Sequence, residues 1–348
     1  MDRDLEKILF QPLLGRKKYI QNLNTYQVEQ LLSVANRFLL SGFLLNYHYF
    51  DNSSKFLKNN LIKINKEYLK KLLLIDSKVI ELSKLFHKQG IEHVFMKGTA
   101  LKFGNYYSNN ERQYRDIDIL VKSEDLMKAY SLAKELKFKY MNSKTSDSVK
   151  YFEHSHQLPV MLDENRVPLE IHHRVTSPIF FDNCPLKDSF FKNKVCHGSI
   201  NIPCDEDLLL HSFYHGIKHD YYSIPKAPIF LFDFINICKK NNNSFFKIQK
   251  KMKIIGLDEE YEILDKIYQL SISKKKLDSE VLKYIRKITS NFNWSESQRK
   301  RKINLHNILY ELKHIRYLYQ TSFFSFKYIS ILLSDIKRYF FKKTNNLN

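Results

Sequence analysis

Two aspartates separated by one residue are the side chains of this chain best placed to do chemistry. Asp116 and Asp118 alternate with apolar residues over 115–121, a pattern that predicts a β-strand. Because side chains along a strand alternate between its two faces, both carboxylates project from the same face. They repel each other there, and a divalent cation that prefers oxygen donors, Mg²⁺ or Mn²⁺, removes this cost. The pair therefore predicts a metal site.

A short motif upstream of the aspartates suits phosphate. Lys97-Gly98-Thr99 follows an apolar run at 91–96, which predicts a strand, and begins a short expected helix at 99–107. Gly98 lets the backbone approach a phosphate closely, and a helix N-terminus presents unpaired N–H groups to it. The Thr99 hydroxyl adds a donor. The two motifs together indicate a protein that holds a metal and a phosphate-bearing ligand.

A third carboxylate is available on a further expected strand at 167–175. Glu170 faces away from Ile171 in that strand. Transfer of a phosphate-bearing group builds up negative charge on the reacting phosphate and on the leaving group, and two metal ions held by three carboxylates stabilise it. We therefore predict that Asp116, Asp118 and Glu170 are catalytic and hold two Mg²⁺ (or Mn²⁺) ions. Arg112 is expected to contact the triphosphate as a bidentate donor.

These motifs resemble the uncharacterised nucleotidyltransferase family of the DNA polymerase β superfamily. The resemblance covers roughly 91–240 and is closer in its first half. It is carried by Lys97-Gly98-Thr99, Leu101, Tyr106, Arg112, Asp116-Ile117-Asp118-Ile119-Leu120-Val121 and Pro168-Leu169-Glu170-Ile171-His172, with Leu209-Leu210-His211 and Phe232-Asp233-Phe234 as the nearest later matches. The resemblance implies an α/β (α+β) fold: a polymerase-β-like core with a small mixed sheet, flanked by helical regions.

One position departs from the family pattern. The family commonly has a small residue before the first aspartate, whereas this chain has Arg115. An arginine there could pair with a carboxylate and compete with metal. We place Arg115 with the nucleotide-binding candidates Lys97, Gly98, Thr99 and Arg112. His172 is expected to hydrogen-bond a metal-holding carboxylate and so to orient it.

The elements that must position these residues follow from hydrophobic periodicity. Residues 1–90 are expected to be helical, with apolar stripes at 31–43 and 69–86, and Gly90 is expected to end the second helix. A helix capped by Ser123 is expected at 123–136. Strands are expected at 138–141, 151–162, 167–175 and 193–202, with a turn at 163–165 between the second and the third. A helix is expected at 205–218, followed by helices to the end. We divide the chain into an N-terminal helical region at 1–90, a catalytic core at 91–203 and a C-terminal helical region at 204–348.

Composition excludes several classes of protein. The chain has 348 residues, of which 43% are hydrophobic, so a substantial core is expected rather than global disorder. Four cysteines without a C-x-x-C pair argue against a disulfide framework or a zinc ribbon and favour a reduced, cytoplasmic setting. The N-terminus does not have the pattern of a signal peptide, and no run of about 18 apolar residues is present, so we expect no membrane partner.

The strong positive charge has two interpretations. The formal net charge of +20 could mark an electrostatic surface for nucleic acid, nucleotide or an acidic partner. It could also reflect composition alone, since the chain is rich in Lys, Asn and Ile, as expected of an AT-rich genome. The lysines are scattered with only short runs, and this favours the second interpretation.

Histidines also allow two interpretations. His154 and His156 share one face of an expected strand near His172-His173, so a zinc or iron site is conceivable. We prefer a polar pocket in which these histidines hydrogen-bond phosphate or carboxylate. His211, His215 and His219 recur along one helix face, where packing against the core is the better explanation.

The motifs favour a metal-dependent nucleotidyltransferase that uses an NTP, with ATP expected first. The acceptor is not readable from the sequence; it is a protein side chain, a small molecule or RNA. Two alternatives remain open. One is a degenerate module that binds nucleotide or nucleic acid without catalysis, and the other is a phosphotransferase that moves the γ-phosphoryl group.

Overall fold

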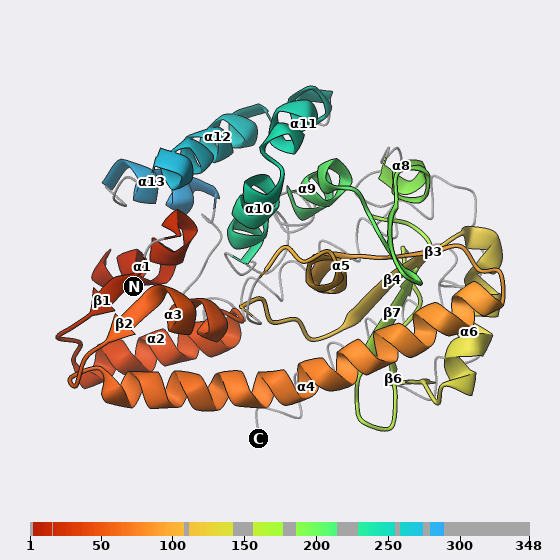
Figure 1. The fold of residues 1–348 in the computed structure, drawn as a ribbon, viewed down its shortest axis with the longest axis horizontal. Coiled ribbons are helices and arrows are strands. Elements are labelled where there is room, and N and C mark those ends of the chain that lie inside the picture. The colour runs from red at the N-terminus through yellow and green to blue at the C-terminus, as the bar shows by residue number, and fades with distance from the viewer. Residues whose placement is uncertain are drawn as a thin grey trace, which may run out of the picture.

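The fold is mixed helix and sheet, which confirms the α/β prediction (Figure 1). The computed structural model describes residues 3–15, 17–107, 111–141, 156–176, 186–213, 229–254, 258–273 and 279–288. Helices make up most of it, and a five-stranded sheet lies where the motifs are.

The N-terminal region is helical with one small addition. Its elements are α1 (Arg3–Phe10), η1 (Gln11–Leu14), β1 (Lys18–Ile20), α2 (Thr25–Arg37), α3 (Ser41–Tyr47), β2 (His48–Phe50) and α4 (Lys55–Lys88). Strands β1 and β2 pair in parallel, so the purely helical expectation for 1–90 was wrong here. Each strand has only three residues, too few to show an alternating pattern in the sequence.

The apolar stripe at 31–43 belongs to two helices rather than one. Helix α2 ends at Arg37, and α3 begins at Ser41 after a 120° change of direction. Leu39 in the connection adopts a positive φ of 60°, which breaks the helix. Among the described helices, no single one is long and apolar enough to cross a membrane. Only the bent pair α2 and α3, taken together, meets the criteria of length and apolar composition for such a helix.

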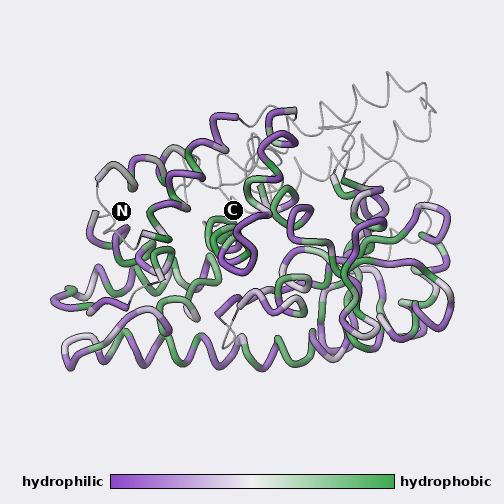
Figure 2. Tube along the Cα trace, turned by 45° about the horizontal axis from the view of Figure 1, so that its top comes forward, coloured by the Kyte–Doolittle hydropathy of each residue, from purple (hydrophilic) through white to green (hydrophobic). Residues whose placement is uncertain are grey.

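Helix α4 connects the N-terminal region to the sheet. It has 34 residues and extends along the molecule from α2 and α3 to the strands (Figure 1). Hydrophobic and hydrophilic residues alternate along it, as expected of a helix with one buried face (Figure 2). Gly90 follows its end with φ 70° and donates its N–H to the carbonyl of His87 at 3.1 Å, which confirms the predicted stop.

The central sheet has the strand order β3-β4-β7-β6-β5. Its strands are β3 (His93–Phe95), β4 (Ile117–Val121), β5 (Lys139–Tyr140), β6 (Met161–Leu162) and β7 (Pro168–His172). Strands β4 and β7 are parallel, and the other neighbours are antiparallel. The turn at 163–165 forms as predicted, because the Asp163 carboxylate accepts the N–H groups of Asn165 and Val167 at 2.9 and 2.7 Å. Residues 151–155 of the expected strand lie outside the described residues.

Two expected elements differ in the structure. Ser123 does not cap a helix; it begins the 3₁₀ turn η2 (Ser123–Asp125), and α6 (Leu126–Glu135) follows with Asp125 at its N-cap. The expected single strand at 193–202 is a hairpin of β8 (Val195–His197) and β9 (Ile200–Ile202). Gly198 turns the chain there with φ 65°, a conformation that glycine adopts without strain.

The remaining described elements are helices that pack back onto the rest. They are α5 (Lys97–Phe103) within the core, and then α8 (Leu186–Lys192), α9 (Asp205–Phe213), α10 (Ile229–Lys240), α11 (Asn242–Ile254), α12 (Asp258–Ser273) and α13 (Ser279–Ile288). Helix α9 starts at Asp205 as predicted, and its expected end near Lys218 lies outside the described residues. Arg286 of α13 pairs with Glu6 of α1, so the C-terminal helices contact the N-terminal region. The division into three domains stays a prediction.

Candidate active site

The parallel pairing of β4 and β7 brings two acidic side chains together. Asp118 lies in register with Glu170, and His172 lies in register with Leu120, two residues further on. Because strand side chains alternate, Glu170 and His172 share the face on which Asp118 projects. Ile119 and Ile171 on the opposite face are fully buried, and this burial fixes the register.

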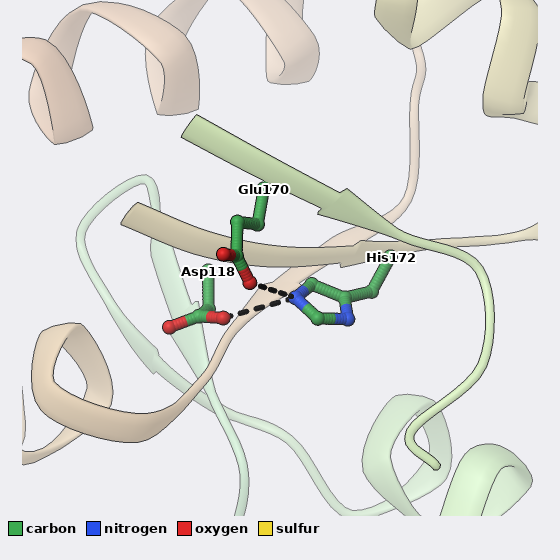
Figure 3. A group of neighbouring side chains, drawn as sticks. All are labelled: Asp118, Glu170 and His172. Atoms are coloured by element: carbon green, nitrogen blue, oxygen red, sulfur yellow. Dashed lines mark hydrogen bonds and ion pairs between the residues drawn. The ribbon is translucent and has the colours of Figure 1, made fainter. Parts of the chain in front are cut away.

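Asp118, Glu170 and His172 form a compact cluster (Figure 3). The Nε2 atom of His172 lies 2.9 Å from Oδ1 of Asp118 and 3.4 Å from Oε2 of Glu170. Asp118 and His172 are each only 1% exposed. The atoms through which these three residues could bind a metal ion all lie within 4.8 Å of one another.

Lys97 supplies the counter-charge in this cluster. Its Nζ atom lies 2.5 Å from Oδ1 of Asp118 and 3.8 Å from Oε2 of Glu170. Burial alone would lower the pKa of Lys97, but Asp118, Glu170 and Asp116 raise this pKa above its ordinary value. Lys97 also has a positive φ of 50°, uncommon for a residue with a side chain, at the junction of β3 and α5.

The two aspartates differ in protonation. Burial first, and then the charge of Asp118, raise the pKa of Asp116 to about 7. Burial would also raise the pKa of Asp118, but Lys97 and His172 outweigh it and hold that pKa well below its usual range. Hydrogen bonds to Asp118 and Glu170 raise the pKa of His172 against the effect of burial. Asp116 is therefore the aspartate of the pair that binds a proton more readily.

The residues present fit a divalent cation. Carboxylate oxygens suit Mg²⁺ and Mn²⁺, and an added cation would offset the repulsion that raises the pKa of Asp116. The predicted ligands were Asp116, Asp118 and Glu170. The compact cluster contains the last two together with His172, and Asp116 lies beside it, coupled to both through charge. The predicted ligand set stays a prediction.

We call Asp116, Asp118, Glu170, Lys97 and His172 together the acidic cluster. A pocket of about 300 Å³ adjoins this cluster, and we call it the nucleotide pocket. Lys97, Gly98 and Asp116 line it from the core, and Arg112 and Asp233 contribute to the same wall. Residues of α9 and α10 and of the α2–α3 connection complete the lining. This volume lies at the lower end of the range for small-molecule sites in proteins.

Gly98 is required by packing. A Cβ atom at this position would lie 2.3 Å from Cβ of Tyr114, so no side chain fits without moving that residue. Thr99 is 1% exposed, and its Oγ1 atom has no hydrogen-bond partner among the described residues. Gly98 lines the nucleotide pocket, whereas Thr99 is not among its lining residues.

Arg112 is held by a residue for which the sequence predicted no role. Its Nε and Nη2 atoms donate to Oδ1 and Oδ2 of Asp233 at 2.7 and 3.0 Å, and the Tyr107 hydroxyl donates to the same carboxylate. Asp233 raises the pKa of Arg112 against the effect of burial. The available signal was an acidic residue inside the apolar run of α10, where an unpaired carboxylate would be costly.

Arg115 faces away from the acidic cluster. Its exposed guanidinium donates to the carbonyl of Asn36 at 3.0 Å and to the Tyr68 hydroxyl, and it lies 5.5 Å from the centre of the Tyr68 ring. It pairs with no carboxylate in the part of the chain that the structure describes, so it does not compete there for the metal ligands. It lines the nucleotide pocket, and its predicted role in nucleotide binding remains open to test.

The histidines divide between the site and the core. The His156 ring centroid lies 5.5 Å from that of His172, next to the acidic cluster. His211 is 2% exposed and packs edge-on against Phe190, and it also lines the nucleotide pocket, so the packing explanation and a role facing the nucleotide both stay open. His154, His215 and His219 lie outside the described residues.

The mixed helix and sheet fold, with acidic side chains from adjacent strands beside a pocket, is consistent with an α/β nucleotidyltransferase. A family model described as uncharacterised nucleotidyltransferase matches residues 26–247. This match covers more than half of the chain, so the chain belongs to the uncharacterised nucleotidyltransferase family, as the motifs indicated. The match begins at α2, well before the motifs, so the long helix α4 belongs to the family's fold. A search of the curated proteins finds no match.

Proposed function

We propose that this protein is a metal-dependent nucleotidyltransferase that transfers an NMP group from an NTP, with ATP expected first, to an acceptor hydroxyl. The observation that best supports this proposal is the in-register pairing of Asp118 with Glu170 beside a pocket lined by Asp116 and Lys97. The family supports nucleotidyl transfer in general, and the ions, the NTP and the acceptor belong to the proposal. A cytoplasmic location, which the cysteine spacing predicts, is also part of it.

Each residue of the site has a role in this proposal. Asp116, Asp118 and Glu170 hold two Mg²⁺ ions, which when bound neutralise charge on the triphosphate. His172 donates to Asp118 and Glu170 and holds their carboxylates in place. Lys97 gives the pocket wall a positive charge that attracts the triphosphate.

Asp116 is suited to take the proton of the acceptor. The acceptor oxygen attacks the α-phosphorus, the bond to the bridging oxygen breaks, and pyrophosphate leaves. The acceptor hydroxyl loses its proton in this step. A carboxylate beside the metal ions, such as that of Asp116, takes this proton.

Label transfer tests the proposal. The full-length protein is incubated with cell extract, Mg²⁺ and ATP labelled at either the α- or the γ-phosphate. Nucleotidyl transfer predicts an acceptor labelled only from α-labelled ATP, with the labelling lost in Asp116→Ala. Glu164→Ala is the matched control, because Glu164 is an exposed acid whose partner is Lys137.

The two alternatives give different results in the same assay. Labelling from γ-labelled ATP alone would identify a phosphotransferase. No labelled acceptor from either ATP, together with salt-sensitive RNA binding, would identify a binding module without catalysis.

A further inference from the structure

A second pocket, of about 560 Å³, adjoins the nucleotide pocket. It lies between α4, the segment that precedes β4 and the turn between β6 and β7. Figure 1 shows α4 passing this end of the sheet. Tyr114 and Arg115 line both pockets, so a molecule in one would lie next to a molecule in the other.

The second pocket is basic. Lys71, Arg115 and Arg166 line it, and none of its lining residues is acidic. Neither Lys71 nor Arg166 forms an ion pair with any carboxylate of the described residues. We call this site the basic pocket, after these three side chains.

Acids close to the lining residues in the sequence have partners of their own: the Tyr114 hydroxyl donates to Asp76, and Asp163 accepts N–H groups of its own turn. Glu67 of α4 pairs with Lys70 at 3.1 Å, and Glu164 of the β6–β7 turn pairs with Lys137 at 3.2 Å. Neither glutamate lines the pocket. The positive charge of the pocket is therefore left for a ligand to neutralise.

Two parts of the basic pocket are held in place before any ligand binds. The Arg115 guanidinium is fixed by the Asn36 carbonyl and by Tyr68. Arg166 has a positive φ of 61°, within the turn that the Asp163 carboxylate closes. Because less side-chain and backbone freedom remains to be lost, binding to such groups is more favourable.

We propose that the basic pocket binds a phosphate group of the acceptor, so that the acceptor is a phosphate-bearing molecule. Guanidinium groups bind phosphate through paired hydrogen bonds, and the volume accommodates a group of mononucleotide size. Tyr114 and Arg115 line both pockets, so an acceptor whose phosphate lies in the basic pocket can extend into the nucleotide pocket, which Asp116 lines. This inference rests on the proposed function, because it assigns the substrate class of the same reaction.

A binding experiment tests the pocket without catalysis. The full-length protein is saturated with Mg²⁺ and α,β-methylene-ATP, whose bridging carbon prevents cleavage and which fills the nucleotide pocket. Ribose 5-phosphate and a short single-stranded RNA are then titrated by calorimetry, as probes for a small and a polymeric phosphate-bearing acceptor. Ribose serves as the probe without phosphate.

The variant Lys71→Gln/Arg166→Gln removes two charges from the pocket. Lys63→Gln/Lys66→Gln is the control, because it removes two charges from exposed positions on the same helix, outside the pocket, and leaves the Lys70–Glu67 pair in place. We expect wild type and control to bind one of the two phosphate probes, and the pocket variant to bind it about tenfold or more weakly. The preferred probe tells which kind of acceptor is used.

Three results would overturn the inference. They are no saturable binding of either phosphate probe to the wild type, ribose bound as tightly as its phosphate, and equal weakening in the pocket variant and the control. The last result would mean that overall charge, not the pocket, attracts the probe. These outcomes are separate from failure of the proposed function, which the labelling assay detects without either variant.

Discussion

Two groups of charged side chains border the nucleotide pocket, and they differ in how completely their charges are neutralised. Arg112 and Asp233 form a two-bond ion pair to which Tyr107 adds a hydrogen bond. The acidic cluster instead has Asp116, Asp118 and Glu170 facing Lys97 and His172, and burial, followed by the charge of Asp118, raises the pKa of Asp116 to about 7. A balanced pair stabilises the fold, whereas an unbalanced cluster leaves charge for a ligand to neutralise.

The two groups also join different parts of the chain. Arg112 precedes β4 and Asp233 lies in α10, so their pair ties the C-terminal helices to the core. In the acidic cluster, Asp118, Glu170 and His172 lie on two hydrogen-bonded strands of one sheet, and Asp116 directly precedes the first of these strands. We therefore expect substitutions in the cluster to affect activity most, and substitutions in the pair to affect stability most.

The largest expected effect is on activity, in the acidic cluster. Asp118→Asn keeps the shape of the side chain but removes a charge that Lys97 and the metal require. We expect label transfer by the folded variant to fall by about 10³-fold or more, and the melting temperature to fall as well, because Lys97 loses its nearest carboxylate. Transfer within about tenfold of wild type would show that Asp118 is not a metal ligand.

The next effect is on stability, in the ion pair. Arg112→Met leaves the Asp233 carboxylate buried without its cation, and we expect about 3 kcal/mol less free energy of unfolding in urea. Lys247→Met serves as the control, because Lys247 forms an exposed ion pair with Glu206, and such pairs contribute little. A loss of stability no larger than in this control would remove the contrast between the two groups.

The pH dependence of the free energy of unfolding, measured without metal, tests the raised pKa of Asp116 in the acidic cluster. Folding raises the pKa of Asp116 from 3.8 to about 7, so between these values the folded protein retains a proton that the unfolded chain has released. The contribution of Asp116 to stability is therefore present below pH 4 and is lost as the pH rises through 7. We expect a loss of roughly 2–4 kcal/mol over this range.

Asp116→Asn isolates this effect in urea unfolding curves at several pH values. The raised pKa of His172 gives a change of the same sign, but it remains in the variant. We expect the variant to have a flatter profile and to gain less melting temperature from Mg²⁺ at pH 8 than the wild type. Parallel pH profiles would mean that burial and the charge of Asp118 do not raise the pKa of Asp116.

The smallest effect is expected from Tyr107→Phe, which removes one hydrogen bond to Asp233 and keeps the ion pair. We expect a loss of about 1 kcal/mol in the free energy of unfolding, with label transfer within about twofold of wild type. A large loss of transfer with stability intact would instead place Tyr107 and Asp233 in the reaction.

The motifs could be predicted from the sequence because each depends on residues that are close together along the chain. The alternation around Asp116 and Asp118 required a strand, and Gly90 ended its helix because few other residues adopt a positive φ. The errors also have local causes. Strands β1 and β2 are too short for periodicity to reveal them, and the apolar residues at 31–43 fit a single helix until Leu39 turns the chain.

The sequence alone determined the family, the acidic strand and the glutamate strand, because these depend on residue types and on spacing along one chain. Only the tertiary structure decided which side chains meet. It placed Glu170 in register with Asp118, joined Arg112 to Asp233 and directed Arg115 away from the carboxylates. Such pairings depend on strand register and helix packing between distant segments, and the free energy of burying the whole core sets them rather than any local pattern.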